Sequence, residues 1–240
     1  MHQSFLKTHS KIVLALDLEI QDSQILVEKS LSILDDVKEY ICGVKVNRQL
    51  LLLLGLPVLR GIVRRAHEYS LPVIMDAKLN DVGHTNAFMT RAFLEAGFDG
   101  VIASPVPGWE GGMDSVFDLA RENGKAVILL VYMSNPGAAH FYSMIVDEDG
   151  RRPIFEYFAE LAVQWKAQGV VVGATRPSII SRVRSLIGPA IAIYSPGVGT
   201  QGGDAREAIN AGATYLIVGR TICSSPRPAE AARSLCELVS

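Results

Sequence analysis

Short apolar runs alternate with longer segments of helical periodicity along the whole chain. Gly, Pro or Asp marks nearly every boundary between the two kinds of segment, which is typical of repeated strand and helix units. The apolar and β-branched runs predict eight strands, at residues 11–17, 40–46, 71–78, 100–104, 126–133, 169–173, 190–195 and 214–218. Helical patterns lie in the gaps between these runs, for example at residues 22–37 and 86–96.

The number of units favours an α/β fold of the (β/α)8 TIM barrel type. The 240 residues give each of the eight units about 30 residues, which is enough for a strand, a helix and two loops. An open, doubly wound sheet is the alternative, but the first strand lacks the G-x-G-x-x-G turn that often follows it in such folds. No linker or shift of composition divides the chain, so we expect one domain over residues 1–240. The longest connection, residues 134–152, follows the fifth strand, and loops of this length are commonly functional.

Composition limits the classes of partner. Hydrophobic residues make up 49% of the chain and the mean hydropathy is +0.24, which suits many buried strands. The net charge is −2, without a long run of one sign, so we expect no nucleic-acid partner. No segment approaches 18 apolar residues and the first seven residues lack a signal-peptide core, so we expect no membrane partner. Cys42, Cys223 and Cys236 show no disulfide or zinc spacing and indicate a reducing, cytoplasmic location.

Charged residues at the end of the third predicted strand are the first sign of chemistry. Asp76, Lys78 and Asp81 follow an apolar run. On an extended strand Asp76 and Lys78 project to the same face, so an acid and an ammonium must share one site. A structural ion pair is the alternative interpretation, but desolvating two charges usually costs about as much as their attraction returns.

The first two strands also end in polar groups. Asp17 ends the first, and Lys45 and Asn47 end the second. Barrel enzymes place their active sites at the carboxyl ends of the strands. Five charges, namely those of Asp17, Lys45, Asp76, Lys78 and Asp81, are therefore expected at one rim, which separate structural ion pairs would not predict.

The other side of this rim offers glycines and one arginine. Residues 195–204 form a glycine-rich segment after the seventh strand, and Gly219 and Arg220 follow the eighth. Glycines let backbone N–H groups approach an anion, and a guanidinium binds phosphate oxygens in pairs. The loops after strands seven and eight are the usual phosphate site of this fold. The sequence thus indicates an enzyme for a small phosphorylated metabolite.

Taken in order, these motifs resemble those of orotidine 5'-monophosphate decarboxylases, in particular the compact, archaeal-like microbial forms. The D-x-K-x-x-D motif alone specifies only a superfamily, whereas the ordered set is specific. The matching segments are residues 14–17, 44–47, 76–86, 133–138, 195–204 and 218–220.

The resemblance implies cofactor-independent decarboxylation of orotidine 5'-monophosphate to uridine 5'-monophosphate in de novo pyrimidine biosynthesis. Lys45, Asp76, Lys78 and Asp81 look like the family's alternating charge array, with Asp17 near the ribose. Lys78 would protonate C6 of the pyrimidine after CO2 leaves, and Asp76 would lie against the departing carboxylate. Lys45 would hold both aspartates and a ribose hydroxyl.

The resemblance also implies roles in substrate binding and assembly. Ser134 is similar to the family's pyrimidine-contacting serine, and Gln201 to a glutamine that bridges base and phosphate. Gly219 and Arg220 match the phosphate binders. The remaining implied contacts are Pro196 and Val198 in a closing loop, Val82 near the carboxylate, and Asp81 and Thr85 in the neighbouring subunit's site. The last two imply a homodimer with shared active sites.

Two positions depart from the family pattern. Asn135 stands where many members have His, and Gly83 stands where many have Pro. Neither supplies a catalytic group, so the departures concern loop detail. His84 lies beside the motif, but Lys78 already fills the acid's role, so we expect His84 to be a solvated residue at a helix start.

Two other functions remain open at this point. A magnesium-dependent sibling of the hexulose-phosphate synthase or keto-gulonate-phosphate decarboxylase type shares D-x-K-x-x-D, but usually carries a Glu near the end of the second strand. Here that strand end has Lys45 and Asn47, so we expect no metal and no cofactor. A non-catalytic barrel that binds a phosphorylated ligand is the second alternative, and it leaves the five charges unexplained.

Overall fold

The computed structural model describes residues 10–146 and 151–239, within which eight parallel strands close into a barrel. In chain order the strands are β1 (Ile12–Ala15), β2 (Gly43–Asn47), β3 (Val73–Leu79), β4 (Gly100–Ala103), β5 (Ala126–Tyr132), β6 (Gly169–Val172), β7 (Ala192–Pro196) and β8 (Tyr215–Val218). Each strand pairs with the next in sequence, and β8 pairs with β1 to close the ring. The predicted (β/α)8 TIM barrel is confirmed.

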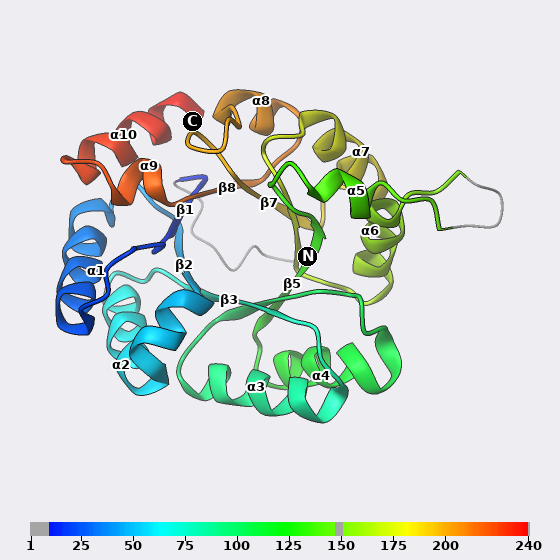
Figure 1. Cartoon of the computed structure of the whole chain (residues 1–240), viewed down its shortest axis with the longest axis horizontal. Coiled ribbons are helices and arrows are strands. Elements are labelled where there is room, and N and C mark those ends of the chain that lie inside the picture. Colours follow the sequence, from blue (N-terminus) through cyan, green and yellow to red (C-terminus); the bar gives the residue numbers. More distant parts are fainter. Residues whose placement is uncertain (1–9, 147–150, 240) are drawn as a thin grey trace.

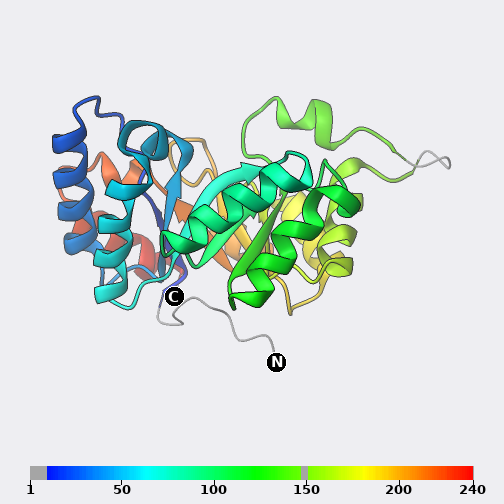
Figure 2. The same cartoon turned by 90° about the horizontal axis from the view of Figure 1, so that it is seen from below.

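Helices surround the strands, as Figure 1 shows. They are α1 (Ser23–Val37), α2 (Arg48–Glu68), α3 (Gly83–Glu95), the π-helical turn η1 (Trp109–Met113), α4 (Asp114–Glu122), α5 (Ala138–Tyr142), α6 (Ile154–Gln164), α7 (Pro177–Ile187), α8 (Ala205–Asn210), α9 (Arg220–Cys223) and α10 (Pro228–Val239). α5 differs from the others, because the segment that carries it projects from one end of the barrel rather than lying in the ring (Figure 2).

The predicted elements are present, with ends shifted by at most three residues. The strand predicted from residue 40 begins at Gly43, because the chain there is still turning out of α1, and the N–H of Tyr40 donates to the carbonyl of Val37 at 2.9 Å. The helix predicted from residue 86 begins at Gly83, one residue after its N-cap, Val82. Both differences lie at turns, where periodicity carries the least information.

The core has two apolar layers. Inside the barrel lie side chains such as those of Val13, Ile74 and Tyr194. Side chains on the opposite faces of the strands, such as Leu14 and Val44, pack against the helices. Strands buried on both faces read as continuous apolar runs, so a charge on such a strand belongs only at its end.

The long connection after β5 has structure of its own. Of the predicted residues 134–152, part forms α5, and Ile145 pairs with Pro153 in an antiparallel bridge. Residues 147–150 of this connection lie outside the described part of the chain, as do residues 1–9 and 240. The domain bounds 1–240 and the expectation about the first seven residues therefore stay predictions.

None of the helices in the described ranges combines the length and apolarity that a membrane span needs. Cys42 and Cys223 are free thiols and both are buried, whereas Cys236 is partly exposed. Burial raises the pKa of Cys42 and of Cys223 to about 12. These two thiols stay protonated at neutral pH and act as small apolar groups in the packing.

Candidate active site

Four charged side chains form a continuous chain where the first three strands end. Nζ of Lys45 lies 3.3 Å from Oδ1 of Asp17 and 3.2 Å from Oδ2 of Asp76. Nζ of Lys78 lies 2.7 Å from Oδ1 of Asp76. Acid and base therefore alternate, and Asp76 lies between two ammonium groups.

The inner pair of this array is desolvated. The side chains of Lys45 and Asp76 are only 7% and 11% exposed. Burial alone would lower the pKa of Lys45, but Asp76 and Asp17 outweigh it and the pKa is raised. Burial would likewise raise the pKa of Asp76, but Lys45 and Lys78 bring that pKa below its usual value. Both groups therefore stay charged at neutral pH.

Strand register and one irregularity bring these groups together. In the parallel ladder Asn47 of β2 pairs with Asp76 of β3, so the polar ends of both strands meet at one rim. β3 is not a regular strand as the simple alternation assumed, because its register with β4 shifts between Met75 and Leu79, and Lys78 has a φ of 46°. A left-handed backbone is strained for a lysine, and such strain is concentrated at functional sites.

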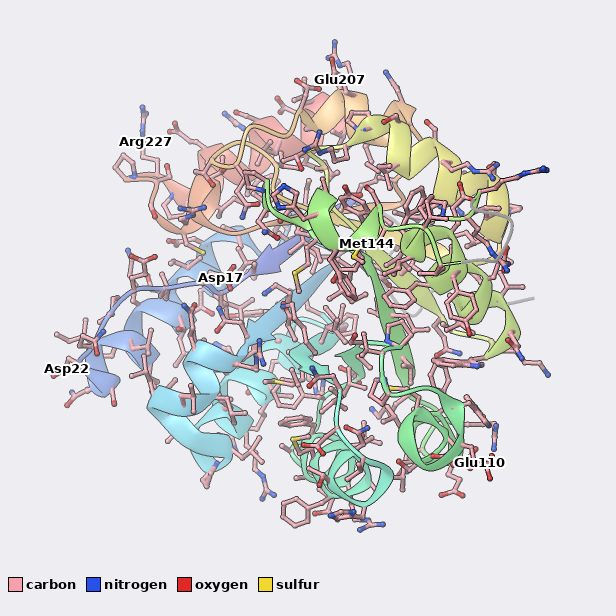
Figure 3. All side chains as sticks on the ribbon, turned by 45° about the vertical axis from the view of Figure 1, so that its right-hand side comes forward. Asp17, Asp22, Glu110, Met144, Glu207 and Arg227 are labelled. Carbon is pink, nitrogen blue, oxygen red and sulfur yellow. The ribbon has the colours of Figure 1, made fainter. Side chains whose placement is uncertain are left out.

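A cavity of about 220 Å³ opens beside the array, and its apolar floor lies inside the barrel. The floor consists of Ile102, Leu130, Val171 and Ile217. Figure 3 shows Asp17 well inside the outline of the molecule, whereas Asp22 and Arg227 lie at its edge. The cavity thus offers an apolar surface for a ring, with the four-residue charge array along one side.

The other wall of the cavity holds the predicted binding residues. Ser134, Pro196, Val198, Gln201, Gly219 and Arg220 all line it. Ser134 lies close to β6, because the Cβ that Gly173 lacks would fall 2.6 Å from the Cα of Ser134. The hydroxyl of Thr175 donates to the carbonyl of Ser134 at 3.0 Å, which holds this part of the wall.

The loop after β7 folds back on itself around glycines. Gly197 and Gly199 have φ values of 97° and 75°, which other residues rarely adopt. The N–H of Gly199 donates to the carbonyl of Gly203 at 2.9 Å, and the N–H of Gly203 donates to Gly197 at 3.0 Å. The loop therefore has internal support while Val198 and Gln201 face the cavity.

The phosphate grip predicted after β8 lies against the charged array. Gly219 is the N-cap of α9, and a Cβ on it would lie 3.1 Å from Oδ2 of Asp17. Arg220 follows, lines the cavity and is exposed. A backbone N–H and a guanidinium at this point supply donors suited to a phosphate.

Three predicted site residues, namely Asp81, Val82 and Thr85, do not line this cavity. Val82, which was expected near the carboxylate, is 52% exposed. Asp81 is exposed just before α3, and Thr85 is half-buried in the first turn of that helix. The buried Asn86 fixes this segment, because its Oδ1 accepts from the N–H of Asp81 at 3.2 Å and its Nδ2 donates to Gly112 at 3.1 Å. Within one chain Asp81 and Thr85 therefore do not share the cavity that Lys78 lines.

The two departures from the family pattern have different surroundings. Asn135 lines the cavity next to Ser134. Gly83 packs against η1, and a Cβ on it would lie 3.0 Å from the carbonyl oxygen of Gly111. A larger residue at position 83 would displace that turn. His84 is exposed in the first turn of α3.

Some residues of the site escaped the sequence analysis. The four floor residues belong to apolar runs, and only the inward phase of each strand would have identified them. Thr200 also lines the cavity, inside the glycine-rich loop. Asn47 was noted only as a strand end, yet its Nδ2 lies 2.6 Å from Oδ1 of Asp17.

Comparison with known proteins adds independent evidence. Residues 10–235 match the model of the family described as orotidine 5'-phosphate decarboxylase / HUMPS. The chain is 36% identical over 228 residues to orotidine 5'-phosphate decarboxylase of Methanococcoides burtonii, covering 95% of this chain and 96% of that protein. It is 38% identical over 224 residues to the protein of that name from Pyrococcus abyssi, covering 93% and 96%.

Solved structures agree with this result. The orotidine 5'-monophosphate decarboxylase of Methanocaldococcus jannaschii, complexed with the inhibitor BMP, matches with a TM-score of 0.82 and 30% identity, covering 96% of this chain and 99% of that one. UMP synthase of Leishmania donovani matches with a TM-score of 0.86 and 28% identity, covering 96% of this chain and 53% of that one. The similarity to the decarboxylases thus extends over nearly the whole of both chains.

Proposed function

The chain belongs to the orotidine 5'-phosphate decarboxylase / HUMPS family, and we propose that Lys78 and Asp76 carry out the decarboxylation within the cavity described above. The enzyme is a carboxy-lyase that converts orotidine 5'-monophosphate to uridine 5'-monophosphate in pyrimidine biosynthesis. The observation that carries the mechanism is the position of Asp76 between two lysines, at the edge of a cavity whose other wall is suited to a phosphate.

The charge array acts on the carboxylate of the substrate. With the pyrimidine on the apolar floor and the phosphate near Gly219 and Arg220, the carboxylate faces Asp76. Two anions repel each other in a desolvated site, and the repulsion ends as CO2 leaves. The ammonium of Lys78 meanwhile stabilises the negative charge that develops at C6. The array therefore favours the transition state over the bound substrate.

Lys78 then completes the reaction as the acid. When the bond from C6 to the carboxylate breaks, its electron pair stays on C6. Lys78 gives one proton to C6, which yields the product, and it recovers a proton from water after release. Lys45 keeps Asp76 and Asp17 in place and binds a ribose hydroxyl beside Asp17.

The other wall binds the parts of the substrate that do not react. Ser134 contacts the pyrimidine, Gln201 bridges base and phosphate, and Pro196 and Val198 close over the ligand. Binding energy from a remote phosphate then organises the reacting end of the substrate. Truncated substrates that lack the phosphate should therefore lose kcat as well as affinity.

The site is proposed to work without a metal. Among the described residues no group of three acidic, histidine or cysteine side chains could hold a metal ion. The ammonium of Lys45 also lies between the carboxylates of Asp17 and Asp76. The magnesium-dependent siblings and a non-catalytic phosphate-binding barrel are the other candidates, and neither accounts for two lysines around Asp76.

One assay tests the function. The ultraviolet spectrum of orotidine 5'-monophosphate is followed in the presence of the purified protein, with and without excess chelator. The proposal expects full conversion at the same rate in both samples. Strict dependence on magnesium would favour the siblings, and an unchanged spectrum despite binding would favour the non-catalytic barrel.

We propose further that two copies share their active sites. The segment that presents Asp81 and Thr85 also exposes Val82 and Phe88, by 52% and 72%. Large exposed apolar side chains next to polar groups are typical of protein interfaces. A second copy packed on this face would receive Asp81 and Thr85 in its own cavity. Free, buried thiols at Cys42 and Cys223 suit the cytoplasm as the place of action.

A further inference from the structure

Asp17 depends on side chains for its position. β1 ends at Ala15, and Asp17 lies two residues beyond it, before α1 begins at Ser23. Its backbone N–H donates to the carbonyl of Ala15 at 2.9 Å, which is a tight local turn. Its side chain is 37% exposed, so packing alone does not fix the carboxylate.

Two donors meet on a single oxygen of this carboxylate. Nζ of Lys45 lies 3.3 Å from Oδ1 and Nδ2 of Asn47 lies 2.6 Å from the same atom. Lys45 is shared, because it lies equally close to Asp76. The shorter contact comes from Asn47, which brings no charge and does not compete for the ammonium.

Both polar atoms of the Asn47 side chain make hydrogen bonds within the protein. It ends β2 and is the N-cap of α2, where its Oδ1 accepts from the N–H of Leu50 at 3.0 Å. Its Nδ2 donates to Gln49 at 2.9 Å as well as to Asp17. One amide thus joins the rim of the barrel, the start of α2 and the carboxylate of Asp17.

The consequence is that one oxygen of Asp17 is left for the ligand. Oδ2 lies beside Gly219, since a Cβ on that glycine would come 3.1 Å from it, and Asp17 and Gly219 both line the cavity. Fixing Oδ1 determines the direction of Oδ2. We propose that Asn47 is a positioning residue for substrate binding, which acts by orienting Asp17 through the N-cap of α2. This inference extends the decarboxylase function and rests on Asp17 contacting the substrate.

Substitutions at position 47 separate the two bonds of the amide. Asn47→Ser keeps an oxygen that can cap α2 but removes Nδ2, the atom that donates to Asp17, and its hydroxyl sits on a shorter side chain. We expect KM for orotidine 5'-monophosphate to rise about tenfold, the usual effect of losing a hydrogen bond to a charged group. We expect kcat to stay within about threefold, because a ribose contact is made equally in the bound substrate and the transition state.

Asn47→Asp provides a readout that a purely structural role would not move. It would place a second carboxylate 2.6 Å from that of Asp17, and carboxylates this close share one proton. The pKa of the pair would rise, so the acidic limb of the profile of kcat/KM against pH should move to higher pH. Raising the pH beyond the shifted acidic limb should recover part of the activity that Asn47→Asp loses.

The matched control is the N-cap of α1. Asp22 caps that helix through the N–H of Ile25 at 2.9 Å, as Asn47 caps α2, but it lies at the edge of the molecule (Figure 3). Asn47→Ala and Asp22→Ala should lower the melting temperature by similar amounts, and only Asn47→Ala should raise KM. Conversion by the unmodified enzyme establishes the function separately. Unchanged KM and pH profile in the Ser and Asp variants, or a fall in kcat at constant KM, would overturn the proposal.

Discussion

Nζ of Lys78 lies 2.7 Å from Oδ1 of Asp76, although the backbone at Lys78 has a φ of 46°. The contact therefore depends on a departure from the regular strand at the point where β3 shifts its register. The ion pair with Asp76 and the burial of the neighbouring residues Ala77 and Leu79 hold the backbone in this strained conformation. The ammonium that we propose as the acid is thus positioned by the fold before any substrate binds.

Replacement of Lys78 should stop turnover without abolishing binding. In Lys78→Ala we expect kcat/KM to fall by at least about a thousandfold, because a positioned proton donor typically contributes between about a hundredfold and ten thousandfold. Steady-state kinetics with orotidine 5'-monophosphate and calorimetric titration with uridine 5'-monophosphate measure the two effects separately.

The chain offers a matched control for this variant. Lys125 also pairs with an aspartate, Asp99, at 2.8 Å, and its side chain is 29% exposed against 30% for Lys78. Lys125→Ala should keep the kinetic constants of the unmodified enzyme. Retained turnover in Lys78→Ala would contradict the proposal that Lys78 is the acid.

Stability should depend on pH through the carboxylate of Asp99. Burial would raise the pKa of Asp99, but hydrogen bonds from Lys125, the N–H of Val73 and His67 bring it below the usual 3.8. The unfolded chain then binds the proton more readily, so the stabilising contribution is present above about pH 4 and is lost as the pH falls through the folded value. Asp99→Asn should therefore cost most stability at neutral pH and progressively less below pH 4.

Urea titrations of both proteins between pH 7 and pH 2.5 measure this difference in the free energy of unfolding. Asp118→Asn is the control, because the side chain of Asp118 is 49% exposed and that of its ion-pair partner Arg121 is 73% exposed. For such a pair we expect less than about 1 kcal/mol at any pH. A constant difference between the unmodified protein and Asp99→Asn across the range would contradict the linkage.

A methyl group at position 219 should disturb the site from the phosphate side. The new Cβ would lie 3.1 Å from Oδ2 of Asp17 and 3.4 Å from the Cβ of Ala15, so Asp17 must move. We expect KM to rise by about tenfold or more in Gly219→Ala, the cost of weakening about one contact to a charged group.

Gly61→Ala is the companion variant, because an added Cβ there meets no atom within 4 Å and the position lies within α2. Alanine in a helix interior stabilises by about 0.5 to 1 kcal/mol relative to glycine. This variant should therefore melt higher and keep its KM. An unaltered KM in Gly219→Ala would mean that Asp17 can move without consequence.

Periodicity was sufficient to predict the barrel, since strands buried on both faces give continuous apolar runs that differ clearly from the periodic pattern of the helices. The charged half of the site followed as well, because Asp17, Lys45 and Asp76 lie near the carboxyl ends of consecutive strands and parallel strands end at one rim. These inferences needed only the order of residues along single elements.

Features that depend on two elements at once could not be predicted. The left-handed backbone at Lys78 accompanies a shift of register between β3 and β4. No residue type in β3 indicates that shift in the sequence. The bond between Asn47 and Asp17 joins residues 30 apart, and the sequence identifies Asn47 only as the end of the second predicted strand. The close approach of Gly83 to η1 likewise depends on how α3 packs.

The location of Asp81 leads to a test of the shared active site. Asp81 is exposed and does not line the cavity of its own chain, so we expect it to act in the cavity of a second copy. If so, Lys78→Ala and Asp81→Ala subunits are each inactive alone, but a mixed dimer contains one intact site. With random exchange half of the dimers are mixed, so about a quarter of the normal activity should return.

The control mixture, Lys78→Ala with Asp76→Asn, should recover nothing, because Lys78 and Asp76 form an ion pair within one chain. Equal results from the two mixtures, once exchange of subunits is verified by mass spectrometry, would return Asp81 to the site of its own subunit.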